Sequence, residues 1–142
     1  MKKVTQYYTI ILLATILIFC SCTDKNFPNA QCEDAVCTKD FRTILITIKD
    51  ENLNPIAIDS FKVIDLSNAA DITIPLSTSG FQTAQQNGEY PLVNDMSFSE
   101  NSQKQIQFYA YKNNIEIVNE RYTVSTDCCH INLNTGVLEI IL

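Results

Sequence analysis

The stretch that decides the fold is Lys104–Val124, KQIQFYAYKNNIEIVNERYTV. Apolar and polar residues alternate along it, so that Ile106 and Phe108 fall on one side of an extended chain. Asn113-Asn114 interrupts the alternation, and asparagine tolerates the positive φ that a tight hairpin turn requires. The stretch therefore predicts two antiparallel strands joined by a short turn, each with one face buried.

The same alternation recurs on both sides of this hairpin, and turn residues separate the runs. No amphipathic helix is predicted. About seven or eight strands in roughly 100 residues predict an all-β fold, a single two-sheet β-sandwich that occupies residues 41–142. The other predicted strands lie in Phe41–Asp50, Ile56–Leu66, Asp71–Leu76, Glu89–Val93, Cys129–Leu133 and Val137–Leu142.

Two local signals refine this prediction. The apolar phase shifts between Ile58 and Phe61, which predicts a β-bulge near Asp59-Ser60. Pro75 and Pro91 lack the amide donor of a central strand, so both are predicted on sheet edges.

The segment Ser77–Asn87 is polar and is predicted as a long loop with Phe81 as its anchor. Binding modules built on a β-sandwich contact their ligands through loops and sheet edges. We therefore expect a binding surface near this loop and near the two proline-marked edges.

The N-terminus predicts secretion and lipid attachment. Lys2-Lys3 precedes an apolar run, Ile10–Cys20, that is long enough for a signal peptide but too short to span a bilayer. Phe19-Cys20-Ser21-Cys22 resembles a bacterial lipobox, in which a small residue precedes the cysteine that takes the lipid. Residues 1–21 are thus predicted to be a lipoprotein signal peptide, Cys22 the lipidation site, and residues 22–40 a tether. Ordinary secretion without lipid is the alternative.

Four further cysteines predict disulfides. A secreted chain with an even number of thiols forms bridges, and three connectivities are open to Cys32, Cys37, Cys128 and Cys129. Bridges from the first pair to the second close loops of about 90 residues, each worth about 4–5 kcal/mol in the chain-entropy model. Zinc held by these thiols and His130 is the alternative, but the C-x₄-C and vicinal spacings differ from those of zinc knuckles. We therefore predict no metal and no cofactor.

Charge narrows the class of partner. The chain has a formal net charge of −6, and removal of residues 1–21 takes away two lysines and no acid, which leaves −8. Nucleic acid binding requires clustered Lys and Arg, so a nucleic acid partner is excluded.

No motif predicts catalysis. The single histidine, His130, follows two cysteines that are predicted to be oxidised, and strand alternation predicts that its side chain faces solvent or the outer face of the sheet, as a structural or surface residue. A small hydrolase built on converging carboxylates is the third hypothesis for the function, after the two binding roles given below.

Tyr109 and Tyr111 are predicted on the exposed face of their strand, with Tyr122 on the paired strand, and exposed tyrosines can bind a sugar or a protein. Cross-strand packing of the tyrosines is the alternative.

Three segments resemble the carboxypeptidase-regulatory-like, or transthyretin-like, β-sandwich family. They are ITIKDENLNPI (Ile46–Ile56), SGFQT (Ser79–Thr83) and NGEYPL (Asn87–Leu92). In that family a strand leads into a D-x-x-G-x-P turn, and later G-x-F and G-x-Y-x-L motifs mark two successive strands. Leu53 stands where the family has the turn glycine. The resemblance implies a transthyretin-like β-sandwich; an immunoglobulin-like topology is the alternative.

The whole chain resembles small lipoproteins of unknown function from Bacteroidota, through its lipobox, short polar stem, β-rich body and the late DCCHI (Asp127–Ile131). Asp24-Lys25, after the lipobox, favours the outer membrane. We expect a non-enzymatic binding or assembly module of the cell envelope, anchored to the membrane by its N-terminal lipid. Its partner would be an envelope protein or, in the second hypothesis, a glycan.

Overall fold

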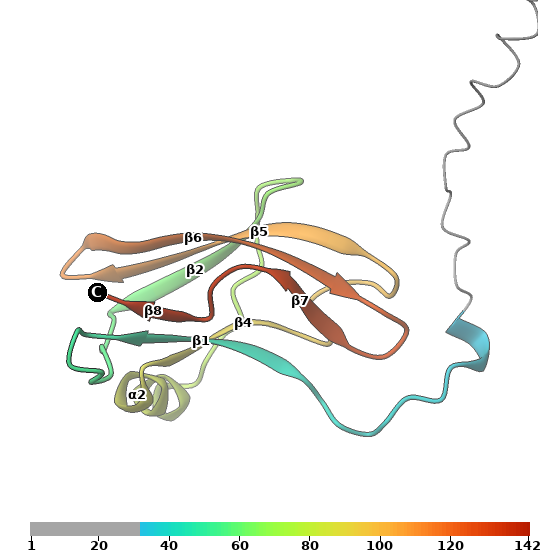
Figure 1. The fold of residues 1–142 in the computed structure, drawn as a ribbon, viewed down its shortest axis with the longest axis horizontal. Coiled ribbons are helices and arrows are strands. Elements are labelled where there is room, and N and C mark those ends of the chain that lie inside the picture. Colours follow the sequence, from blue (N-terminus) through green and yellow to red (C-terminus); the bar gives the residue numbers. More distant parts are fainter. Residues whose placement is uncertain (1–31) are drawn as a thin grey trace, which may run out of the picture.

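The computed structural model describes residues 32–142, and the predicted signal peptide, Cys22 and the tether up to residue 31 lie outside this range. Two β-sheets pack face to face, with one short α-helix beside the smaller sheet (Figure 1). The predicted all-β sandwich is confirmed. In chain order the elements are η2 (Cys32–Asp34), β1 (Thr43–Lys49), β2 (Ser60–Asp65), β3 (Ala70–Asp71), α2 (Thr78–Asn87), β4 (Glu89–Asn94), β5 (Gln103–Lys112), β6 (Ile115–Thr126), β7 (Ile131–Thr135) and β8 (Glu139–Ile141).

The smaller sheet has the strand order β4-β1-β8 and the larger one β3-β2-β5-β6-β7. β1 pairs with β8 in parallel and with β4 antiparallel, while all pairs of the larger sheet are antiparallel. The predicted hairpin forms β5 and β6, and Asn113 and Asn114 in its turn have φ angles of 53° and 61°. Pro91 lies in edge strand β4, as predicted.

The core lies between the two sheets and uses the predicted apolar faces. Ile46 and Ile48 of β1 and Ile106 and Phe108 of β5 are fully buried. Alternation placed these side chains correctly because each strand has one face on the core and one face outside it. The remaining buried apolar residues are Ile58, Phe61, Val63, Ala84, Tyr90, Leu92, Val93, Ala110, Val118, Tyr122, Val124 and Ile131.

The predicted bulge near Asp59-Ser60 is wrong, because the chain passes from one sheet to the other at this point. β1 belongs to the smaller sheet and β2, which begins at Ser60, to the larger one. The Tyr90 hydroxyl donates to the Ile56 carbonyl at 2.8 Å and accepts from the Ile58 amide at 3.1 Å. The shift of apolar phase marks this crossing, since the two sheets face the core from opposite sides.

The predicted loop Ser77–Asn87 is wrong, because ten of these residues form helix α2. The Ser77 side chain accepts from the Gly80 amide, and Gly88 ends the helix in the left-handed conformation with its amide bonded to the Ala84 carbonyl. Serine before a helix and glycine after it are standard caps. Residues 79–83, which the family resemblance implied as a strand, are therefore helical.

The predicted role of Phe81 as an anchor is confirmed. Its ring lies 6.4 Å from the rings of Phe61 and Tyr90, and so α2 contacts aromatic residues of both sheets. The predicted strand Asp71–Leu76 is largely wrong. Only Asp71 lies in a strand, within the two-residue β3, and Pro75 lies outside any strand.

Leu53 occupies a left-handed backbone position, with a φ of 65°, in the turn where the resembled family has glycine. A non-glycine residue pays about 1–2 kcal/mol for this conformation, and the Leu53 side chain is mostly exposed. We expect Leu53→Gly to raise the free energy of unfolding by about 0.5–1 kcal/mol in urea denaturation, after the entropy cost of glycine is subtracted. Asn52→Gly, one residue earlier and without positive φ, is the control and should be destabilising.

Candidate functional site

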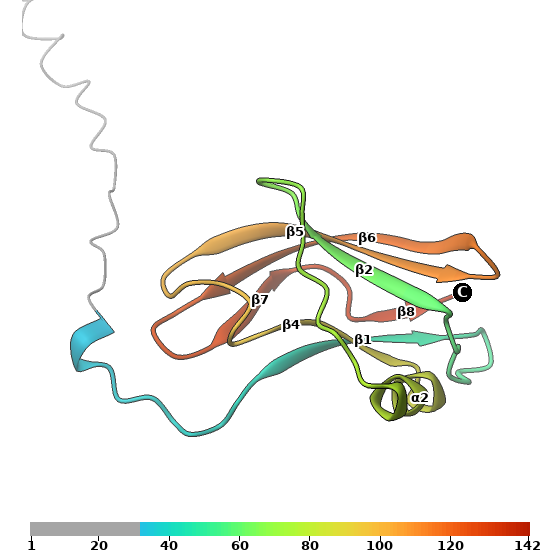
Figure 2. The same cartoon turned by 180° about the vertical axis from the view of Figure 1, so that it is seen from behind.

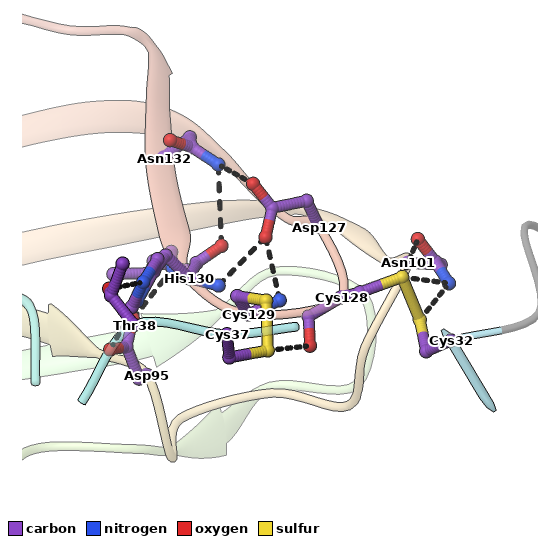
Figure 3. The surroundings of a disulfide bond; sticks show 11 residues. Cys32, Cys37, Thr38, Asp95, Asn101, Asp127, Cys128, Cys129, His130 and Asn132 are labelled. Atoms are coloured by element: carbon purple, nitrogen blue, oxygen red, sulfur yellow. Dashed lines mark hydrogen bonds and ion pairs between the residues drawn. A yellow bond between two sulfur atoms is a disulfide. The ribbon is translucent and has the colours of Figure 1, made fainter. Parts of the chain in front are cut away.

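Two disulfides join the segment before β1 to the turn between β6 and β7 (Figure 3). Cys32 is bonded to Cys128 and Cys37 to Cys129, with Cα–Cα distances of 5.3 Å in both bridges. The preferred sequence prediction, bridges from the first pair of cysteines to the second, is confirmed. Of the two ways to form such bridges, the structure has Cys32–Cys128 and Cys37–Cys129, which we call the parallel connectivity; Cys32–Cys129 with Cys37–Cys128 is the crossed one. We call residues 32–42 the stem. The base of the domain comprises the stem, the β4–β5 loop (residues 95–102) and the β6–β7 turn (residues 127–130).

Asp127 shapes the β6–β7 turn from within. Its Oδ1 accepts from the amides of Cys129 at 2.7 Å and His130 at 2.8 Å. These two hydrogen bonds lower the pKa of Asp127 below its ordinary value, because they stabilise the carboxylate. The vicinal cysteines are thereby presented in a bend rather than in a strand, each toward a different stem cysteine (Figure 3).

His130 has the structural role, one of the two that were predicted, but the prediction that its side chain faces solvent or the outer face of the sheet is wrong. Its side chain is 10% exposed, with Nδ1 3.0 Å from Asp95 Oδ2 and Nε2 2.9 Å from Thr38 Oγ1. Strand alternation does not apply here, because β7 begins only at Ile131. The ring thus connects the β6–β7 turn to the stem and to the β4–β5 loop.

The Asp95 carboxylate accepts hydrogen bonds from three donors in the base. Its carboxylate accepts from the His130 ring, from the Arg42 amide at 2.8 Å and from the Ile131 amide at 2.7 Å. Burial alone would raise the pKa of Asp95, but the three hydrogen bonds outweigh it and lower the pKa below its ordinary value. The charged carboxylate is therefore the form that holds the base together.

Thr38, His130 and Asp95 have the connectivity of a hydroxyl, a base and an orienting acid. The cavity beside them has a volume of only about 80 Å³ and is lined mainly by polar residues of the two base loops. Ligand sites of enzymes usually measure about 300–1,000 Å³. We therefore interpret the three residues as fastening the stem to the sandwich.

Acid should weaken this fastening. The pKa of Asp95 is lower in the folded protein than in the unfolded chain, so the unfolded chain binds the proton first as the pH falls. The Asp95 carboxylate therefore stabilises the fold above the ordinary aspartate pKa, and this stabilisation is lost as the pH falls through the folded pKa. We expect Asp95→Asn to be less stable than wild type by about 1–3 kcal/mol at pH 7. Below about pH 4 the difference should shrink. Urea denaturation at several pH values measures both.

The matched control for this comparison is Asp40→Asn, which removes the same charge from an exposed position of the stem. It should change stability by less than about 0.5 kcal/mol. A constant difference between wild type and Asp95→Asn from pH 7 to pH 3 would contradict the assigned role of the Asp95 carboxylate.

A larger groove of about 350 Å³ lies between α2 and the strands β1 and β4. Sequence reasoning pointed to this region through Ser77–Asn87 and Pro91, although it missed the helix. The groove surface is mainly apolar, from Leu45, Ile74, Leu76, Ala84 and Pro91. Polar residues of the same strands and helix, Thr43, Thr83, Asn87, Glu89 and Asn94, also line it.

The groove runs from α2 to the border of the base, where Thr43 and Asn94 line it. Figures 1 and 2 show α2 near the end of the sandwich that carries the β1–β2 and β5–β6 turns, while η2 and the β6–β7 turn lie at the opposite end. A ligand at the α2 end of the groove would therefore bind on the side remote from the stem.

The three predicted surface tyrosines do not lie together. Tyr109 and Tyr111 lie on the outer face of β5, as predicted, but both are half-buried rather than exposed; Tyr109 pairs with Lys62 of β2 and with Asn119 of β6. The prediction for Tyr122 is wrong, because its ring is fully buried and its hydroxyl donates to the Val137 carbonyl at 2.7 Å. The register pairs Tyr122 with the buried Ile106, so both rest on the core face.

No family model, curated protein or solved structure matches this chain. Within residues 32–142, no helix is long and apolar enough to cross a membrane. The same residues contain no group of three or more His, Cys, Asp and Glu side chains placed to hold a metal ion.

Proposed function

We propose that this protein is a lipid-anchored component of the cell envelope, at the outer membrane, whose sandwich acts as a binding or assembly module without catalysis. The apolar groove between α2 and the strands β1 and β4 carries this proposal, since its volume of about 350 Å³ is in the range of ligand sites. The two disulfides support an oxidising compartment, in which such bridges form and persist.

The groove suits an apolar group that is presented on a polar backbone, such as a side chain of an envelope protein. Leu45 and Pro91, paired across β1 and β4, contribute apolar surface beside polar neighbours. Burial of an apolar group against them would contribute about 25 cal/mol per Å². The polar residues along the groove would set its orientation through hydrogen bonds.

The groove is tested by affinity capture from detergent-solubilised membranes with the wild type, Leu45→Arg and Ile115→Arg. Leu45 lines the groove and is 40% exposed, whereas Ile115 is an exposed apolar residue in the β5–β6 hairpin. Ligands retained by the wild type and by Ile115→Arg should be lost with Leu45→Arg. Equal retention by all three proteins would contradict a binding role for the groove.

The lipid anchor is tested by Cys22→Ser with Cys20→Ser as the matched control. Both variants remove one thiol from the same segment, but only Cys22 follows the small residue Ser21. We expect Cys22→Ser to leave the membrane fraction and to lack acyl mass, because stable attachment requires two or more acyl chains. Cys20→Ser should remain in the membrane fraction. Membrane fractionation of Cys22→Ser like that of the parent would contradict the anchor.

Carbohydrate binding is the second candidate, favoured by Tyr109 and Tyr111 on the outer face of the larger sheet. Near them, the Gln107 side chain donates to Asn119 Oδ1, and Asn119 Nδ2 donates to Glu116 at 2.8 Å. Aromatic faces beside amide groups are a suitable surface for a sugar ring. A glycan array should show retention that the double variant Tyr109→Ala/Tyr111→Ala loses. An array without any retained glycan would discard this candidate.

A further inference from the structure

The two most exposed large hydrophobic side chains of residues 32–142 lie in the base of the domain. Val36 in the stem is 97% exposed and Met96 in the β4–β5 loop is 83% exposed. Phe41, also in the stem, is 58% exposed. Such side chains are costly to leave in water, and none of them lines the groove beside α2.

Hydrogen bonds and a disulfide hold these three residues in the base. Next to Phe41 and Met96, the Arg42 amide donates to Asp95 Oδ2 at 2.8 Å and the Asp95 amide donates to the Arg42 carbonyl at 3.1 Å. Val36 precedes Cys37, which is bonded to Cys129 in the same base. The base therefore presents apolar side chains from two segments that are fastened to one another.

The length of chain between the lipid and the base limits how far apart they can be. Cys32 follows the predicted lipidation site Cys22 by ten residues. Ten residues span at most about 33–36 Å even when fully extended. The base is thus the part of the sandwich that the anchor holds within reach of the bilayer surface.

The charged residues of the base indicate which lipid headgroups it can contact. Lys39 and Arg42 bring positive charge to the base, but Asp34, Asp40 and Glu100 bring more negative charge. Anionic headgroups would repel this surface, whereas zwitterionic headgroups would not. The apolar side chains, rather than charge attraction, would make the contact.

We propose that the base of the domain rests on the bilayer to which Cys22 is anchored, with Val36, Phe41 and Met96 in the interfacial region. This inference rests on the proposed lipid anchor. It gives the domain a fixed orientation, with the α2 end of the sandwich directed away from the lipid (Figure 2). The two disulfides make this orientation possible, because they join the anchored segment rigidly to the sandwich.

The absence of tryptophan from the chain allows a direct test. Full-length lipidated protein would be prepared as Met96→Trp, Phe41→Trp and Ile115→Trp, and reconstituted into phosphatidylcholine vesicles with brominated acyl chains, which quench nearby tryptophan. Ile115 is the matched control, since it is 64% exposed but lies in the hairpin remote from the base. Tryptophan favours the membrane interface, so Met96→Trp and Phe41→Trp should lose about half of their fluorescence and shift to shorter wavelength. Ile115→Trp should change little.

The outcomes separate this inference from the proposed function. If all three variants sediment with the vesicles and none is quenched more than Ile115→Trp, the seating of the base is overturned while the lipid anchor stands. If the proteins do not sediment with the vesicles, the anchor fails and the inference fails with it. Circular dichroism of each variant, compared with the wild type, confirms that the exposed substitutions leave the sandwich folded.

Discussion

Removing both disulfides is expected to lower the free energy of unfolding by about 7 kcal/mol, whereas removing either one alone should cost about 2 kcal/mol. The first bridge closes a loop with a sequence separation of 92 or 96, worth about 4–5 kcal/mol in the chain-entropy model. Once it has formed, the second closes only the short path from Cys32 to Cys37 and from Cys128 to Cys129. The sequence-based value of about 4–5 kcal/mol for each bridge therefore counts the long loop twice.

The measurement is urea denaturation of Cys32→Ala/Cys128→Ala, of Cys37→Ala/Cys129→Ala and of the fourfold variant, all under oxidising conditions. Most domains have a net stability of about 5–15 kcal/mol, so the fourfold variant should be close to unfolding. Wild type with a reductant should behave like the fourfold variant. If the costs of removing Cys32–Cys128 alone and Cys37–Cys129 alone add up to the cost of the fourfold variant, the overlap of the two long loops does not lower the contribution of the second bridge, and this prediction is contradicted.

The connectivity has its own control within this series. Cys32→Ala/Cys128→Ala removes one bonded pair and should show no reactive thiol in denaturant without reductant. Cys32→Ala/Cys129→Ala removes one member of each bridge and should leave the thiols of Cys37 and Cys128 reactive. Two reactive thiols in Cys32→Ala/Cys128→Ala and none in Cys32→Ala/Cys129→Ala would instead assign the bridges Cys32–Cys129 and Cys37–Cys128.

Gly136→Ala is expected to destabilise the fold by about 3–5 kcal/mol, through overpacking and backbone strain together. Gly136 has a φ of 125° where the chain leaves β7 for β8, and an added Cβ would lie 2.1 Å from Cδ1 of Tyr122. The Tyr122 ring cannot move away easily, because it is fully buried and its hydroxyl is bonded to the Val137 carbonyl. Burial also raises the pKa of Tyr122, so the hydroxyl keeps its proton and remains a donor.

Gly80→Ala is the matched control for this substitution. Gly80 lies within α2, and an added Cβ would have Ser77 Oγ as its nearest neighbour at 3.2 Å. Since alanine is favoured over glycine in a helix by about 1 kcal/mol, Gly80→Ala should be neutral or stabilising. Thermal unfolding of the two variants makes the comparison. A Gly136→Ala protein within about 1 kcal/mol of wild type would contradict the close packing of Gly136 against the Tyr122 ring.

Alternation predicted most of the strands because each strand has a different environment on its two faces. β5 and β6 are the clearest case, where Ile106 and Phe108 lie inside and Tyr109 and Tyr111 outside. The prediction for Tyr122 is wrong because it relied on proximity to Tyr109 and Tyr111, whereas alternation along β6 puts Tyr122 on the same face as Val118 and Val124, which are both buried.

The sequence analysis does not predict helix α2, because most residues of Ser77–Asn87 are polar and the segment was predicted as a loop. The signals were nevertheless present: Ser77 before the helix, Gly88 after it, and Phe81 and Ala84 three residues apart on one face. Because the groove depends on this helix, the residues that α2 contributes to it could not be predicted either.

Only part of the structure of the base could be predicted from the sequence. An even number of cysteines in a secreted chain predicted bridges between the two cysteine pairs, but spacing alone cannot choose between the parallel and crossed connectivities. The roles of Asp95 and Thr38 were beyond sequence reasoning, because they reach His130 over separations of 35 and 92 residues. Asp127 carried a usable signal, since aspartate commonly accepts from amides two or three residues later in a turn.

The decisive measurement is the intact mass of the native protein, extracted from membranes with detergent and measured before and after reduction. We expect a chain that begins at Cys22 with acyl mass, together with a gain on reduction that corresponds to two disulfides. A chain that begins elsewhere without acyl mass, or four thiols that react before any reductant is added, would contradict the account of a lipid-anchored sandwich fastened at its base.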